Sequence, residues 1–306
     1  MVYNARAMRR GVLFLMLLTG CATVPQQGIR VDHNRIMRGG KALTEAFAAI
    51  DSFDVSESRG EVVFSAKRSD NFDIGLVSTD GSPISWVPAD PSDEVGVRWA
   101  PRGNKIGYVV RTKLGDVVRT VHIPTSAALT VDFPNAKIES LAWDATGDQF
   151  AITYSTPDAS SRVETMTYAG KQRVMTAKPA QELDVVVETF APGAISIRPR
   201  DLRYNEKLPL VIWVENEPYA WSDARAELMR GARVAIVITR SFGDFLWKVA
   251  DETAWLDASR AFVVNGGGVS RRDGTVAVAP AVVQSFAARF IAEELKRTGT
   301  PNGSSR

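Results

Sequence analysis

Trp99-Ala-Pro-Arg-Gly103 and Trp143-Asp-Ala-Thr-Gly147 decide the fold, because each joins a tryptophan to a glycine turn that leads into an apolar strand. A weaker copy without the tryptophan, Ser56-Glu-Ser-Arg-Gly60, lies upstream. The three glycines are 43 and 44 residues apart. A fixed period of about 40–45 residues is typical of a four-stranded propeller blade. Residues 53–198 are therefore expected to form a propeller-like β-repeat array of about three blades.

Strand-like runs separated by turn signals fill this region. They are Val62–Ser65, Asp73–Ser78, Val97–Trp99, Lys105–Arg111, Val117–Ile123, Leu141–Trp143, Gln149–Tyr154 and Val163–Tyr168. Propellers usually close with about 4–8 blades, so three repeats are too few. Two alternatives follow. Either residues 183–198 supply one more degenerate blade, or the array stays open and packs on the C-terminal part.

The pattern changes at Lys207. Leu208–Val214, Val234–Ile238 and Ala261–Val264 are continuous apolar strands of the kind that a parallel sheet buries. Helices are expected at Ala224–Met229 and from Pro280 onward, the second with an apolar stripe of Val282, Val283, Phe286, Phe290 and Ile291. Alternation of strands and helices predicts a small α/β domain over residues 199–306.

The N-terminus predicts export. Arg9 and Arg10 precede the short apolar run Gly11–Leu18, which ends at Cys21. This is the layout of a secretory signal over residues 1–21, whether the chain starts at Met1 or at Met8. Cys21 is the only cysteine, so an intramolecular disulfide is excluded.

The sequence Leu18-Thr-Gly-Cys21 resembles the bacterial lipobox, which implies that Cys21 carries the lipid (palmitate among its acyl chains) and becomes the mature N-terminus. In lipoproteins a residue other than Asp after the cysteine implies sorting to the outer membrane, and here that residue is Ala22. Residues 22–38 are expected to be a polar tether. Leu43, Phe47 and Ile50 recur at helical spacing, so a short helix that covers the following strands should complete residues 22–52.

The tryptophan–glycine blocks resemble the Trp-Ser-Pro-Asp-Gly repeats of Tol-associated periplasmic propellers and of prolyl oligopeptidase-type enzymes. The aspartate of that motif is replaced by Arg102 in one copy and by Thr146 in the other. Trp99 and Trp143 are interpreted as packing residues, because buried aromatic side chains mostly supply contact area.

The α/β segment resembles the hydrolase domain of the same peptidase family. Pro209–Pro218 is similar to the strand that ends in His-Gly-Gly-Pro, but its turn reads Glu215, Asn216, Glu217 and Pro218. Two carboxylates would repel a developing oxyanion. Arg260–Gly268 is similar to the strand entering the nucleophile elbow, and Gly267 takes the position of the serine. The resemblance implies a vestigial pocket formed by Glu215–Pro218 and Gly267, with no catalytic residue.

Histidine use agrees with the loss of catalysis. The only histidines are His33 and His122, and neither follows the α/β strands, where the general base of a Ser-His-Asp triad would lie in this fold. Gly266–Gly268 lacks the following Lys-Ser/Thr of a phosphate loop, so no nucleotide cofactor is expected. One cysteine and two distant histidines disfavour structural zinc. A net charge of +2 without a basic run disfavours nucleic acid.

The leading hypothesis is a lipid-anchored, non-catalytic binding or scaffolding protein of the cell envelope. It would contact the membrane through its N-terminal lipid, on the periplasmic face of the outer membrane, and bind an envelope protein. The alternative is a hydrolase of altered mechanism that uses Ser241, Ser270 or an acidic residue of the Glu215–Glu217 loop. A third possibility is a truncated remnant of a longer gene.

Overall fold

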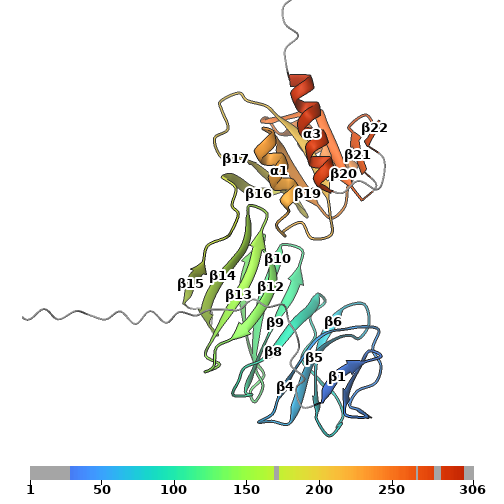
Figure 1. Ribbon diagram of the computed structural model, residues 1–306, viewed down its shortest axis with the longest axis vertical. Coiled ribbons are helices and arrows are strands. Elements are labelled where there is room, and N and C mark those ends of the chain that lie inside the picture. Colours follow the sequence, from blue (N-terminus) through green and yellow to red (C-terminus); the bar gives the residue numbers. More distant parts are fainter. Residues whose placement is uncertain (1–27, 169–171, 267, 279–283, 300–306) are drawn as a thin grey trace, which may run out of the picture.

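The computed structural model describes residues 28–168, 172–266, 268–278 and 284–299. Its two parts follow one another along the long axis of the molecule (Figure 1). A β-repeat part is built from antiparallel sheets, and an α/β part carries all three helices described. Residues 1–27, which include Cys21 and the expected signal peptide, lie outside the described residues.

Three four-stranded antiparallel sheets form the repeats, and the strands of each follow one another in chain order. The first sheet is β4 (Ile50–Ser56), β5 (Glu61–Lys67), β6 (Phe72–Ser78) and β7 (Ser85–Trp86). The second is β8 (Asp93–Trp99), β9 (Lys105–Thr112), β10 (Gly115–His122) and β11 (Ala127–Pro134). The third is β12 (Lys137–Trp143), β13 (Gln149–Thr156), β14 (Ala159–Thr167) and β15 (Arg173–Ala177). The sheets do not close into a ring (Figure 1).

The glycines that set the period occupy equivalent turns. Gly60, Gly103 and Gly147 each lie between the first and second strands of a sheet, with φ of 63°, 68° and 70°. Such left-handed conformations suit glycine because it has no Cβ. Trp99 is 5% exposed in the core between the first two sheets, and the Trp143 indole donates to Arg98 O at 3.3 Å. The interpretation of both tryptophans as packing residues is confirmed.

Two predictions about residues 22–52 are wrong. Residues 29–42 are not a tether but a three-stranded sheet of β1 (Ile29–Asp32), β2 (Arg35–Arg38) and β3 (Lys41–Ala42). Residues 43–49 form no helix, because the Leu43 and Phe47 amides donate to Ile36 O and Asn34 O of this sheet instead of to helical partners. Leu43, Phe47 and Ile50 nevertheless pack in one cluster against β5 and β6, so they cover the first repeat sheet as expected.

The α/β part is built on a seven-stranded sheet of order β16-β17-β19-β18-β20-β21-β22. Its strands are β16 (Val185–Ala191), β17 (Ala194–Pro199), β18 (Leu208–Val214), β19 (Ala235–Thr239), β20 (Leu256–Asn265), β21 (Gly268–Arg271) and β22 (Val276–Val278). β18 runs parallel to both β19 and β20, as continuous apolar strands predict. β16 and β17 form a hairpin, and β17 pairs with β19 of the α/β sheet. The α/β part therefore begins at this hairpin and not after residue 198 as expected, and residues 183–198 are not a further blade.

Helices cover both faces of this sheet. α1 (Asp223–Gly231) and α3 (Gln284–Gly299) pack on one face, and α2 (Asp244–Glu252), which periodicity did not predict, packs on the other. α1 matches the expected helix, and the Ser222 hydroxyl caps it by accepting from the Arg225 amide at 3.4 Å. Pro280, Val282 and Val283 lie outside the described residues, and nothing is described of the Phe286 side chain. The rest of the expected α3 stripe includes Phe290, which is partly buried, and Ile291, which is fully buried.

Candidate functional site

A cavity of about 430 Å³ lies where the two parts meet. Sheet residues of the β-repeat part line one side of it, and the turn after β18 together with the end of β19 lines the other. The lining residues are Asp51, Phe72, Asp93, Val95, Arg111, Asp116, Ala136, Lys137, Asn216, Glu217, Pro218, Tyr219, Ala220 and Arg240. In open α/β sheets, ligands commonly bind outside the carboxyl ends of the parallel strands, which is where this cavity lies.

A buried ion pair fixes the turn that forms this wall. Glu215 follows β18, and its Oε1 lies 3.2 Å from a guanidinium nitrogen of Arg225 in α1. The Arg225 side chain is 1% exposed and also donates to Ala220 O at the far end of the turn. Burial raises the pKa of Glu215 and Arg225 opposes that rise, while burial lowers the pKa of Arg225. Arg225 therefore fixes both ends of the turn 215–220, through Glu215 at its start and through the carbonyl of Ala220 at its end.

Three contacts join this wall to the β-repeat part. Lys137 of β12 forms an ion pair with Glu217. The Tyr219 hydroxyl donates to Lys113 O, and Arg240 Nη2 donates to Thr112 O at 3.5 Å. Both carbonyls belong to the end of β9 and the turn that follows it, so residues of the α/β part hold that turn in place.

The carboxylates on the β-repeat side already have structural partners. Asp116 Oδ2 accepts from Arg111 and from the Ile138 amide at 2.6 Å, and burial raises the pKa of Asp116 against the lowering effect of Arg111. Asp93 accepts from the Phe72 amide at 3.0 Å. Asp51 accepts from the Gly96 amide at 2.8 Å. These hydrogen bonds give the cavity fixed anionic groups.

The cations of the lining differ in how far they are neutralised. Arg111 is paired with Asp116, and Lys137 is paired with Glu217. Arg240 is exposed, and within the part of the chain that the structure describes no carboxylate lies in ion-pair range of it. Arg240 is therefore the lining cation whose charge no carboxylate of the described residues neutralises, and its guanidinium can meet an anionic group of a ligand.

The expected pocket residues separate into three groups. Asn216, Glu217 and Pro218 line the cavity, whereas Glu215 lies beneath it with Arg225. Gly267 lies outside the described residues. Its flanking strands β20 and β21 pair antiparallel, with Asn265 opposite Gly268, so the chain turns back as a hairpin instead of entering a helix as a nucleophile elbow does.

The candidate nucleophiles and bases are dispersed. No serine, cysteine or histidine is among the residues that line the cavity in the described ranges. Ser241 lies just after β19, where its amide donates to Thr239 Oγ1, and Ser270 lies in β21 opposite Val263. His33 contacts Asp32 and His122 contacts Thr125, so neither imidazole is paired with a serine.

Metal and membrane features are not found in the described ranges. Three or more His, Cys, Asp or Glu side chains do not gather there in a way that could hold a metal ion. No helix of that part is both long enough and apolar enough to cross a bilayer.

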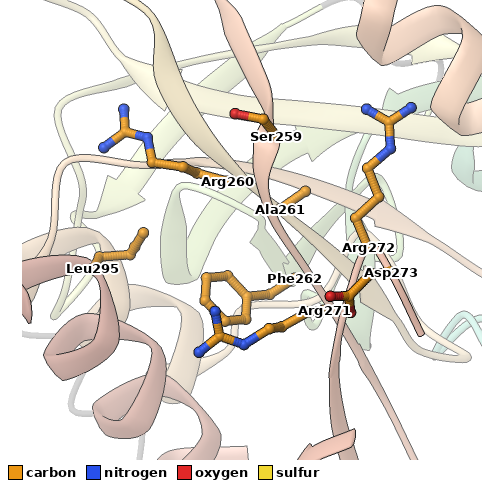
Figure 2. A pocket seen from close by; sticks show the side chains of 8 residues that line it. All are labelled: Ser259, Arg260, Ala261, Phe262, Arg271, Arg272, Asp273 and Leu295. Atoms are coloured by element: carbon orange, nitrogen blue, oxygen red, sulfur yellow. The ribbon is translucent and has the colours of Figure 1, made fainter. Parts of the chain in front are cut away.

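A second cavity, of about 470 Å³, lies on the α/β part (Figure 2). Arg260, Arg271 and Arg272 line it, and Figure 2 shows their guanidinium groups pointing in different directions. Each guanidinium is paired with a carboxylate. The partner of Arg260 is Asp257 at 2.7 Å, that of Arg271 is Glu294, and that of Arg272 is Asp251 at 2.6 Å. The three arginines in the described lining of this cavity are therefore all neutralised by carboxylates.

Comparisons with known proteins show similarity of fold only. No protein-family model matches the sequence, and no curated protein matches it. Among solved structures the chain is similar to a prolyl endopeptidase, with 10% identity and a TM-score of 0.55 over 75% of this chain and 41% of that one. It is also similar to the acylaminoacyl peptidase of Pyrococcus horikoshii, with 11% identity and a TM-score of 0.53 over 75% of this chain and 42% of that one.

TolB from Acinetobacter baumannii matches 45% of this chain and 35% of its own, with 15% identity and a TM-score of 0.39, which is too low to carry an argument. The chain spans about two fifths of the length of the two peptidases. Their similarity agrees with the expected prolyl oligopeptidase-type layout, in which a β-repeat part precedes an α/β part.

Proposed function

We propose that this protein is a non-catalytic binding module that holds a peptide segment in the cavity between its two parts, and that a lipid on Cys21 carries it at the cell envelope. The observation that supports the first half is the make-up of the cavity wall. Glu217 and Asn216 occupy the turn that resembles the oxyanion turn of the peptidases, and an ion pair with Lys137 ties Glu217 to the opposite part. Such a wall is suited to holding a ligand, whereas carboxylates accept hydrogen bonds and offer no donor to a developing oxyanion, which disfavours acyl transfer.

Peptide is the ligand class that the cavity favours. Its volume lies within the usual range of about 300–1,000 Å³ for small-ligand pockets. Its lining combines fixed carboxylates, the guanidinium of Arg240 and the apolar surfaces of Phe72, Val95 and Tyr219. A peptide offers carbonyls, amides and charges of both signs to such a mixture. The two solved structures of similar fold are peptidases, which is consistent with a scaffold that accommodates polypeptide.

Binding can be tested with fluorescein-labelled synthetic peptides of varied length and charge, by fluorescence anisotropy. Loss of one charge-assisted hydrogen bond is worth about 1.5–3 kcal/mol, so Arg240→Ala should weaken binding about 10- to 150-fold. Arg260→Ala is the control, because it removes a guanidinium that lines the other cavity and is already paired with Asp257. Peptide binding that Arg240→Ala leaves unchanged, or no binding at all, would contradict the proposed site.

The competing function is hydrolysis by a serine. The test is reaction with a fluorophosphonate probe, together with turnover of ester and peptide substrates, in the native protein and in the Ser241→Ala and Ser270→Ala variants. The binding proposal expects no labelling and no turnover. Labelling that Ser270→Ala or Ser241→Ala abolishes would favour the enzyme.

The envelope location is tested separately. Metabolic labelling with palmitate should mark the native protein and not Cys21→Ala, and membrane fractionation should then release the variant. An envelope protein recovered by affinity capture with the anchored form only would support the scaffolding role. If Cys21→Ala is labelled as strongly as the native protein, the lipid assignment is wrong.

A further inference from the structure

The small sheet of β1, β2 and β3 carries more net positive charge than the whole chain. Its cations are Arg30, Arg35, Arg38 and Lys41, and its one carboxylate is that of Asp32. The complete sequence, with 37 lysines and arginines and 35 acidic residues, has a net charge of only +2. The cations of the chain are therefore concentrated on this sheet beyond what the acids nearby can balance.

Two of these cations point away from the β-repeat array. The inner face of the sheet packs against β5 and β6 through Ile29 and Ile36. Successive side chains of a strand lie on opposite faces, and Arg30 and Arg35 are the neighbours of these two buried residues. Both arginines are exposed, so they lie on the outer face of the sheet.

The other two cations lie where the chain enters the fold. Gly28 is the first residue that the structure describes, and its carbonyl accepts from the Gly39 amide at 3.1 Å. Gly39 belongs to the turn between β2 and β3, which Arg38 and Lys41 flank as a register pair. Arg30 reaches the same turn, because its Nη1 donates to Gly39 O at 3.1 Å. Three of the four cations therefore surround the point of entry.

Carboxylates leave most of this charge uncompensated. Both cations that flank the turn donate to backbone carbonyls after β6, so hydrogen bonds fix their place without neutralising them. Among the described residues, Arg30 is the one cation of the sheet with a carboxylate in ion-pair range, that of Asp32 at 3.6 Å. Asp80 lies near Lys41, but its carboxylate accepts from the Ser82 amide and hydroxyl.

We propose that the β1–β3 sheet is a membrane-contact surface, whose four cations bind the anionic phospholipid headgroups of the membrane that holds the lipid on Cys21. The position of this surface rests on the lipid anchor of the proposed function. Residues 22–27 alone separate Cys21 from Gly28, and a chain of that length spans at most about 25 Å. The anchor therefore brings the basic end of the sheet to the headgroups, where each lysine or arginine strengthens binding about fivefold.

This contact fixes how the molecule stands on the bilayer. The β1–β3 sheet lies toward the end of the long axis opposite to α3 (Figure 1). With this sheet on the membrane, the α/β part and the cavity between the two parts are held away from the bilayer. A peptide can then reach the cavity from solution.

Vesicle flotation tests the contact with the chain from residue 21 onward as Cys21→Ser, which carries no lipid and keeps every described residue. It should bind vesicles of phosphatidylglycerol mixed with phosphatidylcholine, and not vesicles of phosphatidylcholine alone. Raising the salt from about 50 mM to about 500 mM should release it, because salt screens exposed charges. Arg38→Gln with Lys41→Gln should weaken binding about 30-fold. Arg203→Gln with Lys248→Gln removes the same charge from exposed positions of the α/β part, and this matched control should leave binding unchanged.

Arg35→Gln gives a second measurement in case the loss of the Arg38 and Lys41 hydrogen bonds disturbs the sheet. In the described structure the Arg35 side chain has no ion pair and no hydrogen bond, so Arg35→Gln should weaken binding about fivefold at an unchanged melting temperature. No binding to anionic vesicles, equal binding to phosphatidylcholine, or a control variant weakened as much as Arg38→Gln with Lys41→Gln would overturn the proposal. None of these results depends on acylation of Cys21, which palmitate labelling tests, or on peptide binding at the cavity.

Discussion

Replacing Glu215 while Arg225 remains should destabilise the α/β part by about 3–5 kcal/mol, because it leaves a guanidinium charge buried without its counter-ion. Arg225 is 1% exposed, and in the described structure its Nε and Nη1 atoms have no hydrogen-bond partner. Among the described residues, Glu215 at 3.2 Å and the carbonyl of Ala220 are the groups that compensate its charge. For a chain of this size about 2–4 °C of melting temperature corresponds to 1 kcal/mol, so Glu215→Leu should lower the melting temperature by about 6–20 °C.

The double variant separates coupling from simple loss of packing. Arg225→Met should lower the free energy of unfolding less than Glu215→Leu does. The Glu215 side chain is 15% exposed, and its raised pKa allows the carboxyl to become neutral when Arg225 is absent. Glu215→Leu with Arg225→Met should recover at least about 2 kcal/mol relative to the sum of the single losses, because a well-packed apolar pair avoids the desolvation of both charges. Denaturant titration followed by tryptophan fluorescence gives the four free energies of unfolding. If the double loss equals the sum, the pair carries no coupling and the reasoning fails.

Three further outcomes are expected from particular residues. Burial raises the pKa of Glu94 to about 7, against the lowering effect of Arg119, so the folded state favours the protonated carboxyl. Stability should then fall by up to about 3 kcal/mol as pH rises from about 4.5 to about 7, and Glu94→Gln should flatten that part of a denaturation–pH profile. Gly115→Ala should lower the free energy of unfolding by at least about 1–3 kcal/mol, because the φ of Gly115 is 123° and a Cβ would lie 2.4 Å from a backbone oxygen. Gly40→Ala is the control: a Cβ there meets open space, so its melting temperature should be nearly unchanged. Ser222→Ala should lower the free energy of unfolding by about 1 kcal/mol through loss of the α1 cap, and Ser222→Asp should restore it.

The sequence predicted the central strands of the β-repeat part better than its edges. β5, β9 and β13 are apolar runs that follow glycine turns, so composition and turn chemistry indicate the same element. β11 and β15 were not predicted, because they are outer strands whose side chains are mostly exposed and need no alternation of apolar and polar residues. β4 was not predicted for a different reason. Its Asp54 accepts from the Trp99 amide of the next sheet, so a polar side chain of β4 lies where an apolar one would have indicated a strand.

The sequence predicted the part of the candidate site that follows β18, and not the rest of the cavity lining. The turn Glu215–Pro218 was found because it follows a recognisable buried strand, and three of its residues line the cavity. Asp116, Lys137 and Arg240 were not identified as site residues, since their cavity exists only where two distant segments meet. The role of Arg225 was missed as well, because nothing in a short helical pattern distinguishes a buried arginine from a solvated one.

What the sequence determined by itself is local. A 43- to 44-residue period, left-handed turns that suit glycine and continuous apolar strands establish the repeat sheets and the α/β character, because these features depend on neighbouring residues and on side-chain period. Only the tertiary structure decided where the parts divide and what lines the cavity. The pairing of β17 with β19 and the ion pair of Lys137 with Glu217 join segments tens of residues apart, and such contacts are selected by the packing of whole sheets.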